Sequence, residues 1–218
     1  MLKGWLKLND LRGIGYYLVT YSSLSRNGTL SDVKNAVDAG CRIVQYREKN
    51  KFTREMIKEA MELKKLCKDQ AFFLVNDRVD VALAVDADGV HLGQEDIPVD
   101  VARRILGDKK IIGLTVHNVD EAVEAEKLGV DYIGLAPIFK TGTKVDSGEP
   151  CGVEMLKKVR DMVDIPIVAV GGITLDNVYD VVKMGADGVV AVSSVLDSND
   201  VYSRVKDFMK VFKEAGLR

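Results

Sequence analysis

The sequence lacks several features that mark common classes of protein. It has 3 cysteines and 2 histidines in 218 residues, and no CxxC pair. An odd number of scattered cysteines argues against a disulfide framework, and no cysteine–histidine cluster has the spacing of a zinc or iron site. We therefore expect Cys41, Cys67 and Cys151 to be thiols in a reducing compartment.

Long hydrophobic runs and an excess of one charge are also absent. No stretch approaches the ~20 apolar residues of a membrane span, and residues 1–10 carry charges throughout, unlike a signal peptide. The 31 Lys and Arg residues nearly balance the 33 Asp and Glu residues, which indicates no nucleic-acid-binding surface. We expect a cytoplasmic protein with no nucleic-acid or membrane partner, and a homo-oligomer is compatible with the sequence.

Short apolar runs rich in β-branched residues alternate with longer amphipathic stretches. The runs predict strands over 16–20, 42–47, 71–76, 89–93, 111–116, 132–136, 167–171 and 188–193, and the amphipathic stretches predict helices over 31–39, 53–68, 80–85, 99–106, 119–128, 153–162, 175–184 and 200–214. Near-continuous apolar strands are typical of parallel sheets covered by helices. Eight such units predict an α/β protein with one (β/α)₈ TIM barrel domain over residues 1–218, in preference to an open doubly wound sheet. Residues 1–14 are expected to form an N-terminal extension that packs on the barrel.

The segment CRIVQYREK, residues 41–49, gives the first indication of function. An apolar strand here ends in Gln45, Arg47 and Lys49 at alternate positions. Because side chains alternate between the two faces of a strand, these three groups leave the strand end on one side. In a barrel this end belongs to the catalytic face, so the segment predicts a site for an anionic ligand.

Two carboxylates follow the next two predicted strands. Asp77 comes after an apolar run and Asn76, and Asp96 comes after GVHLGQE. Carboxylates at adjacent strand ends can share a hard cation whose other ligands are phosphate oxygens and water, so they predict a Mg²⁺ site. The alternative is that Asp77 caps a helix and Asp96 makes a turn.

The last three strands are followed by residues suited to phosphate. The loop 137–150 contains Thr141, Thr143 and Lys144, and Gly171-Gly172 and Val192-Ser193-Ser194 end the seventh and eighth strands. Barrel enzymes commonly bind phosphate at these two strand ends through backbone N–H groups. A plain solvated loop, a tight turn and a serine helix cap are the alternatives.

In combination, these motifs resemble the thiamine-phosphate synthase family. The segments are QYREK (45–49), VNDRVDVALAVDADGVHLGQED (75–96), GLTVH (113–117), TGTK (141–144), PIVAVGGIT (166–174) and GADGVVAVSS (185–194). The resemblance implies a transferase that condenses 4-amino-2-methyl-5-(diphosphooxymethyl)pyrimidine with 4-methyl-5-(2-phosphoethyl)thiazole, or its carboxylated form. The products are thiamine phosphate and pyrophosphate. These small-molecule substrates would be its partners and Mg²⁺ its cofactor.

The resemblance also implies a role for each site residue. Gln45, Arg47 and Lys49 would bind the pyrimidine pyrophosphate with help from Asn76 and Lys144, and Asp77 and Asp96 would hold Mg²⁺. Thr115, a serine in many relatives, would lie near the pyrimidine or the leaving group. The thiazole phosphate would be bound by Thr141, Thr143, Gly172, Val192 and Ser193. Arg47, Lys49, Lys144 and Thr115 would be the catalytic set.

Three alternatives remain at this point. A thiazole tautomerase-like paralogue uses a histidine at a position like His117, but that group tends to lack the two carboxylates present here. A non-catalytic protein that binds thiamine precursors would need the phosphate sites without the metal pair. A Schiff-base aldolase would need a lysine inside a strand, and no predicted strand interior contains one. His117 itself is interpreted as a general base or, preferably, as a polar rim residue.

Overall fold

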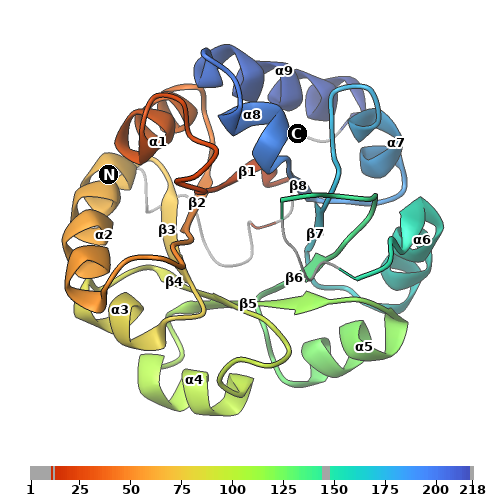
Figure 1. Ribbon diagram of the computed structural model, residues 1–218. Coiled ribbons are helices and arrows are strands. Elements are labelled where there is room, and N and C mark those ends of the chain that lie inside the picture. The colour runs from red at the N-terminus through yellow and green to blue at the C-terminus, as the bar shows by residue number, and fades with distance from the viewer. Residues whose placement is uncertain (1–10, 12, 144–147, 217–218) are drawn as a thin grey trace.

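The computed structural model of the chain describes residues 11, 13–143 and 148–216. Parallel strands pair in chain order, and β8 pairs with β1 to close a barrel (Figure 1). The strands are β1 (Gly15–Val19), β2 (Ile43–Tyr46), β3 (Phe72–Asn76), β4 (Gly89–Leu92), β5 (Ile111–Val116), β6 (Tyr132–Leu135), β7 (Ile167–Val170) and β8 (Gly188–Val190). The prediction of a (β/α)₈ barrel is confirmed.

Helices form a ring outside the barrel (Figure 1). They are α1 (Thr29–Asp38), α2 (Thr53–Cys67), α3 (Val79–Ala84), α4 (Val99–Leu106), α5 (Val119–Lys127), α6 (Gly152–Met162), α7 (Val178–Lys183), α8 (Val192–Leu196) and α9 (Val201–Glu214). The prediction that the eighth strand continues to residue 193 is wrong, because Val192 and Ser193 begin α8. The valine and alanine residues before this helix extend the apolar pattern past the true strand end.

Alternation along the strands divides the apolar residues between two cores. One face of each strand packs against the helices, and the other points into the barrel, where residues such as Ile43, Leu74 and Val168 are at most 1% exposed. Burial of both faces explains why the strands lack a polar face in the sequence.

Leu11 and Ile14 close the barrel at the amino ends of the strands. Both are 1% exposed and belong to the same interior cluster as Ile43, Phe72 and Ile111. These two residues are part of the predicted N-terminal extension, whose residues 1–10 and 12 lie outside the described residues. The single-domain organisation stays a prediction.

Two pairs of backbone hydrogen bonds fix the base of the loop that joins β6 to α6, which spans residues 136–151. Near its start, Ile138 and Phe139 donate to the carbonyls of Val170 and Gly171, at 2.9 and 3.0 Å. Near its end, the N–H groups of residues 151 and 152 donate to the carbonyls of residues 137 and 138, at 2.9 and 3.0 Å. Both ends of this loop are therefore attached at the carboxyl end of the barrel. Among the helices described, none has the length and apolar character needed to cross a bilayer.

Candidate active site

A cavity of about 540 Å³ opens at the carboxyl ends of the strands. The predicted residues that line it are Gln45, Arg47, Lys49, Asn76, Asp77, Asp96, Thr115, Thr141, Thr143, Gly172, Val192 and Ser193. Lys144 lies outside the described residues. The structure therefore brings every predicted site residue that it describes to one cavity, as expected for residues that follow strands in a barrel.

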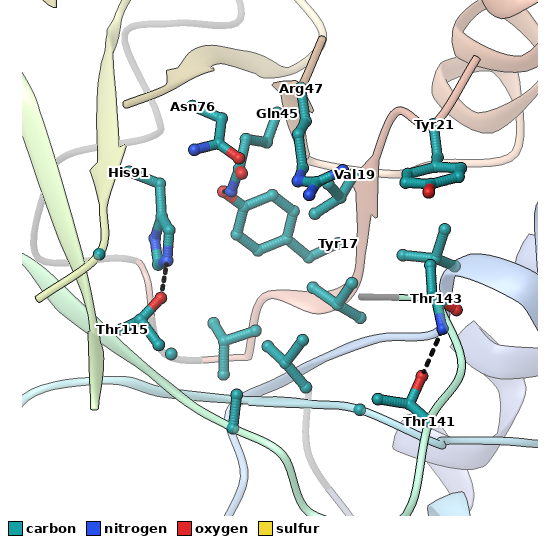
Figure 2. Close-up of a pocket in the computed structure, with 18 of the residues that line it drawn as sticks. Tyr17, Val19, Tyr21, Gln45, Arg47, Asn76, His91, Thr115, Thr141 and Thr143 are labelled. Atoms are coloured by element: carbon teal, nitrogen blue, oxygen red, sulfur yellow. Dashed lines mark hydrogen bonds between the residues drawn. The ribbon is translucent and has the colours of Figure 1, made fainter. Parts of the chain in front are cut away.

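Basic side chains from the end of β2 form one wall of this cavity. The guanidinium of Arg47 lies over the ring of Tyr21, 5.3 Å from the ring centroid, and its backbone N–H donates to Thr20 Oγ1 at 2.9 Å. Figure 2 shows Arg47 beside Gln45 and Asn76. A cation held over an aromatic face stays in place without losing its charge, so this wall suits an anion.

Glu48 organises the backbone that carries Lys49. Its carboxylate accepts hydrogen bonds from the backbone N–H groups of Lys49 and Asn50, at 2.8 and 2.9 Å, and from the Ser22 hydroxyl at 3.0 Å. Burial raises the pKa of Glu48, but these hydrogen bonds and the nearby Lys51 ammonium outweigh it, and the net pKa is lowered. Glu48 is therefore held as a carboxylate beneath the turn.

The two predicted metal carboxylates meet at the ends of β3 and β4. Asp77 is in the left-handed backbone region at φ 58°, and its N–H donates to the His91 carbonyl at 2.9 Å. Asp96 accepts a hydrogen bond from the Gly93 N–H at 2.6 Å. Burial, and then the adjoining Asp77 carboxyl, raise the pKa of Asp96. The fold thus pushes two acidic groups together at some electrostatic cost.

The residues present fit a Mg²⁺ ion. Two crowded carboxylates are hard oxygen ligands, and a bound divalent cation would offset the burial and the Asp77 repulsion that raise the pKa of Asp96. Within the described residues, no cluster of three or more His, Cys, Asp or Glu side chains is arranged to hold a metal. A cation held by only two carboxylates leaves most of its coordination positions for phosphate oxygens and water, as is common for Mg²⁺.

The opposite side of the cavity is built from backbone and small side chains. Gly171 and Gly172 have φ values of 102° and 63°, and a Cβ at Gly172 would lie 2.6 Å from the Lys140 carbonyl oxygen. Asn177 holds this turn by donating to the Gly172 carbonyl at 3.0 Å, and Ser194 Oγ links α8 to it by donating to Ile173 at 2.8 Å. Glycine is required where the chain makes this turn so close to other backbone.

His117 lines the cavity, but its ring is tied to the outside of the barrel. The Nδ1 atom lies 2.8 Å from Glu121 Oε2, and the same carboxylate oxygen accepts from the His117 backbone N–H at 2.9 Å. Its side chain is 44% exposed. These contacts favour the interpretation of a polar rim residue over that of a general base.

Besides Tyr21, three aromatic side chains that line the cavity were not predicted as site residues. Tyr17, His91 and Tyr132 lie at its floor, where Tyr17 Oη is 2.8 Å from Tyr132 Oη and His91 Nε2 is 2.9 Å from Thr115 Oγ1. Both tyrosines lie within apolar strand runs and therefore resemble core residues. The available signal is that a buried tyrosine hydroxyl needs a partner, and alternation puts Tyr17 on the inward face.

A (β/α)₈ barrel with cations, paired carboxylates and a glycine-lined turn around one cavity belongs to the class of barrel enzymes that handle phosphorylated ligands. A family model described as thiamine monophosphate synthase matches residues 16–195. The chain belongs to this family, and the predicted resemblance is confirmed.

Individual relatives agree with the family match. The chain is 57% identical over 207 residues to the thiamine-phosphate synthase of Methanosarcina barkeri, which covers 95% of this chain and 94% of the relative. It is 49% identical over 187 residues to that of Chloroflexus aurantiacus, covering 85% and 86%. The solved structure of thiamine phosphate pyrophosphorylase from Pyrococcus furiosus superposes with a TM-score of 0.87 at 40% identity, covering 94% of this chain and 98% of that one. The prediction of a transferase of this family is therefore confirmed.

Proposed function

We propose that this chain acts as a thiamine-phosphate synthase by a Mg²⁺-assisted dissociative mechanism. It would join the pyrimidine pyrophosphate to the thiazole phosphate and release pyrophosphate; with the carboxylated form of the thiazole, the carboxyl group would also leave as carbon dioxide. The observation that supports the proposal is that two opposite sides of one cavity carry unlike groups, each suited to a different anion. Arg47, Lys49 and the Asp77–Asp96 pair lie on the β2–β4 side, whereas Gly172 and the start of α8 lie on the β7–β8 side.

The two sides suit the two substrates. A pyrophosphate carries high charge and needs cations, which Arg47 and Lys49 supply. A monophosphate can be held by backbone N–H groups, such as those at the turn after β7 and at the start of α8, with help from Thr141 and Thr143. Val168, Val170 and Val190, which line the cavity from β7 and β8, give an apolar surface against which the heteroaromatic rings can pack.

The charges of the site support a mechanism in which the leaving group departs first. The bond from the pyrimidine methylene carbon to the pyrophosphate oxygen breaks, and its electron pair leaves with the pyrophosphate. Arg47 and Lys49 stabilise the negative charge that develops there, with Lys144 as a further predicted cation. Mg²⁺ bound at Asp77 and Asp96 would add positive charge at the same place. The thiazole nitrogen then forms the new carbon–nitrogen bond to the methylene carbon.

This mechanism needs no nucleophile from the protein, and the cysteines do not offer one. Burial raises the pKa of Cys41 to about 11, and it also raises the pKa of Cys151. A thiol with a raised pKa is a poor nucleophile at neutral pH. None of the three cysteines, Cys41, Cys67 and Cys151, lines the cavity.

An assay of the purified protein with both substrates tests the proposal. With Mg²⁺ present we expect thiamine phosphate and pyrophosphate in equal amounts, and addition of a chelator should abolish the product. Arg47→Gln should lower kcat/KM by roughly 10², while Arg54→Gln, an exposed arginine on α2, should leave it unchanged. Binding or isomerisation of the thiazole phosphate without condensation would overturn the proposal and favour the tautomerase or binding-protein alternatives. The cytoplasmic location and a homo-oligomeric state stay predictions.

A further inference from the structure

Five polar side chains form one continuous chain of hydrogen bonds across the floor of the cavity, which we call the floor chain. It runs from Gln45 on β2 through Tyr17, Tyr132 and His91 to Thr115 on β5. The successive distances are 2.7 Å from Gln45 Nε2 to Tyr17 Oη, 2.8 Å from Tyr17 Oη to Tyr132 Oη, 2.8 Å from Tyr132 Oη to His91 Nδ1, and 2.9 Å from His91 Nε2 to Thr115 Oγ1. Figure 2 shows its final link, between His91 and Thr115, and places Tyr17 next to Gln45.

The barrel interior is shaped to hold the floor chain. A Cβ at Gly113 would lie 2.1 Å from Cζ of Tyr132, and one at Gly134 would lie 3.1 Å from Cε1 of His91. Gly113 therefore makes room for the Tyr132 ring, and Gly134 lets the His91 ring lie close against its strand. Tyr17 and Tyr132 are at most 1% exposed. Since both phenols are buried, their hydroxyl groups must find partners inside the barrel.

The orientation of the Gln45 amide gives the floor chain a direction. Nε2 of Gln45 can only donate, so the Tyr17 hydroxyl accepts from it. Burial raises the pKa of both Tyr17 and Tyr132 well above the usual range, so each keeps its single proton. Tyr17 then donates to Tyr132, and Tyr132 donates to Nδ1 of His91. A buried hydroxyl that accepts a hydrogen bond from one neighbour uses its own O–H to donate a hydrogen bond to the next, and the proton stays on the hydroxyl.

The far end of the floor chain follows from this direction. If Nδ1 of His91 accepts the hydrogen bond from Tyr132, it carries no proton, so the imidazole is neutral and its one proton is on Nε2. The Nε2–H group then donates a hydrogen bond to Thr115 Oγ1. The Thr115 hydroxyl lines the cavity, and because it accepts from His91, its own O–H can donate a hydrogen bond to the ligand. We propose that the floor chain is a positioning device that holds His91 as the Nε2-protonated tautomer and so makes Thr115 a hydrogen-bond donor toward the bound pyrimidine pyrophosphate. The ligand in this proposal rests on the proposed function, whereas the tautomer does not.

Nuclear magnetic resonance of the ligand-free protein tests the tautomer directly. The chain has only two histidines, so ¹⁵N-histidine labelling gives two ring systems, and His117→Gln assigns them. We expect His91 to be neutral at pH 7 with its proton on Nε2. In Tyr132→Phe, which cuts the floor chain beside His91, we expect the Nδ1-protonated form to become populated. Tyr16→Phe is the matched control. Tyr16, on β1, is buried like Tyr132, but its hydroxyl lies 3.4 Å from the Ala191 carbonyl oxygen and is not part of the floor chain. A wild-type His91 protonated on Nδ1 would overturn the proposal, whether or not the protein makes thiamine phosphate.

A double-mutant cycle tests the link to Thr115. Once wild-type activity is established, Tyr132→Phe and Thr115→Val should each lower kcat roughly tenfold, the effect expected for loss of one net hydrogen bond. The KM for the thiazole phosphate, which binds on the other side of the cavity, should stay within about twofold. Both changes abolish the same hydrogen bond from the Thr115 hydroxyl to the ligand. The kcat of the double variant should therefore be no lower than that of Thr115→Val alone. Thr115→Ser, which keeps the hydroxyl, should retain activity. Fully multiplicative losses would show that Tyr132 acts independently of Thr115 and would overturn the link.

Discussion

The ammonium group of Lys49 forms an ion pair with the carboxylate of Asp77, and so joins the ends of β2 and β3. The proposed reaction gives each of these residues another partner, because Lys49 would bind pyrophosphate and Asp77 would bind Mg²⁺. If only pyrophosphate bound, Lys49 would turn to it and the Asp77 carboxylate would lose its ion pair. If only Mg²⁺ bound, Asp77 would turn to it and the Lys49 ammonium would lose its ion pair. Arrival of both would exchange one ion pair for two new contacts, so the geometry favours joint binding.

Pyrophosphate and Mg²⁺ should therefore strengthen each other's binding. We expect saturating Mg²⁺ to lower the Kd for pyrophosphate by roughly 5- to 100-fold, measured by titration calorimetry. Asp77→Asn should remove most of this coupling. The control is Asp80→Asn, since Asp80 is 59% exposed and pairs with Arg78. Equal coupling in the wild type and in Asp77→Asn would contradict the assignment of Asp77 as a metal ligand.

Replacement of Gly172 should damage the phosphate side of the cavity. Gly172→Ala puts a side chain at φ 63° and a Cβ 2.6 Å from the Lys140 carbonyl oxygen. We expect a loss of about 1–3 kcal/mol in the free energy of unfolding and a higher KM for the thiazole phosphate. Gly142→Ala is the control in the same loop, because a Cβ there meets nothing within 4 Å. Similar thermal melting of both variants would show that the close approach at Gly172 carries no cost.

Stability should depend on pH through Glu48. Its pKa is lowered in the folded state, so its stabilising contribution is present above the unfolded value of about 4.3 and is lost as the pH falls through the folded value. Glu48→Gln should lower the free energy of unfolding by about 2 kcal/mol at pH 7, and the difference from wild type should shrink below about pH 4. Denaturant unfolding between pH 3 and pH 7 measures this, with the exposed Glu124→Gln as control. A difference that does not change with pH would contradict the role of the Glu48 charge.

Asp32 on α1 should show the opposite dependence. It is 2% exposed, and neither of its carboxylate oxygens has a hydrogen-bond partner among the described residues. Burial raises its pKa, so the folded state loses stability as the pH rises from about 3.9 through the folded value. Asp32→Asn should therefore raise stability at pH 7 by roughly 1 kcal/mol. Asp38→Asn, a change in the same helix at a more exposed residue paired with Lys34, serves as control. An unchanged or lower melting temperature in Asp32→Asn would show that the buried charge is tolerated.

Most of the site could be predicted from the sequence because its residues follow strands. Alternation put Gln45, Arg47 and Lys49 on one side, and the order of units put Asp77 beside Asp96. A closed barrel then brings all strand ends to one mouth, so Gly172 and Ser193 joined the same site without any local signal of contact.

The floor chain could not be predicted in the same way. Tyr17 and Tyr132 belong to β1 and β6, which are not neighbours in the barrel, and they meet only across its interior. No local pattern encodes that distance. The start of α8 was missed for a different reason, since alanine and valine before it fit a strand as well as a helix.

The loop that joins β6 to α6 is attached to the barrel at both of its ends by backbone hydrogen bonds, which any amino acid except proline can donate. Its connection to the scaffold therefore depends little on the side chains between those ends. We expect substitutions of side chains within that interval to change the affinity for the thiazole phosphate more than the stability of the fold. The sequence of the interval can therefore vary while the barrel keeps hold of its two ends.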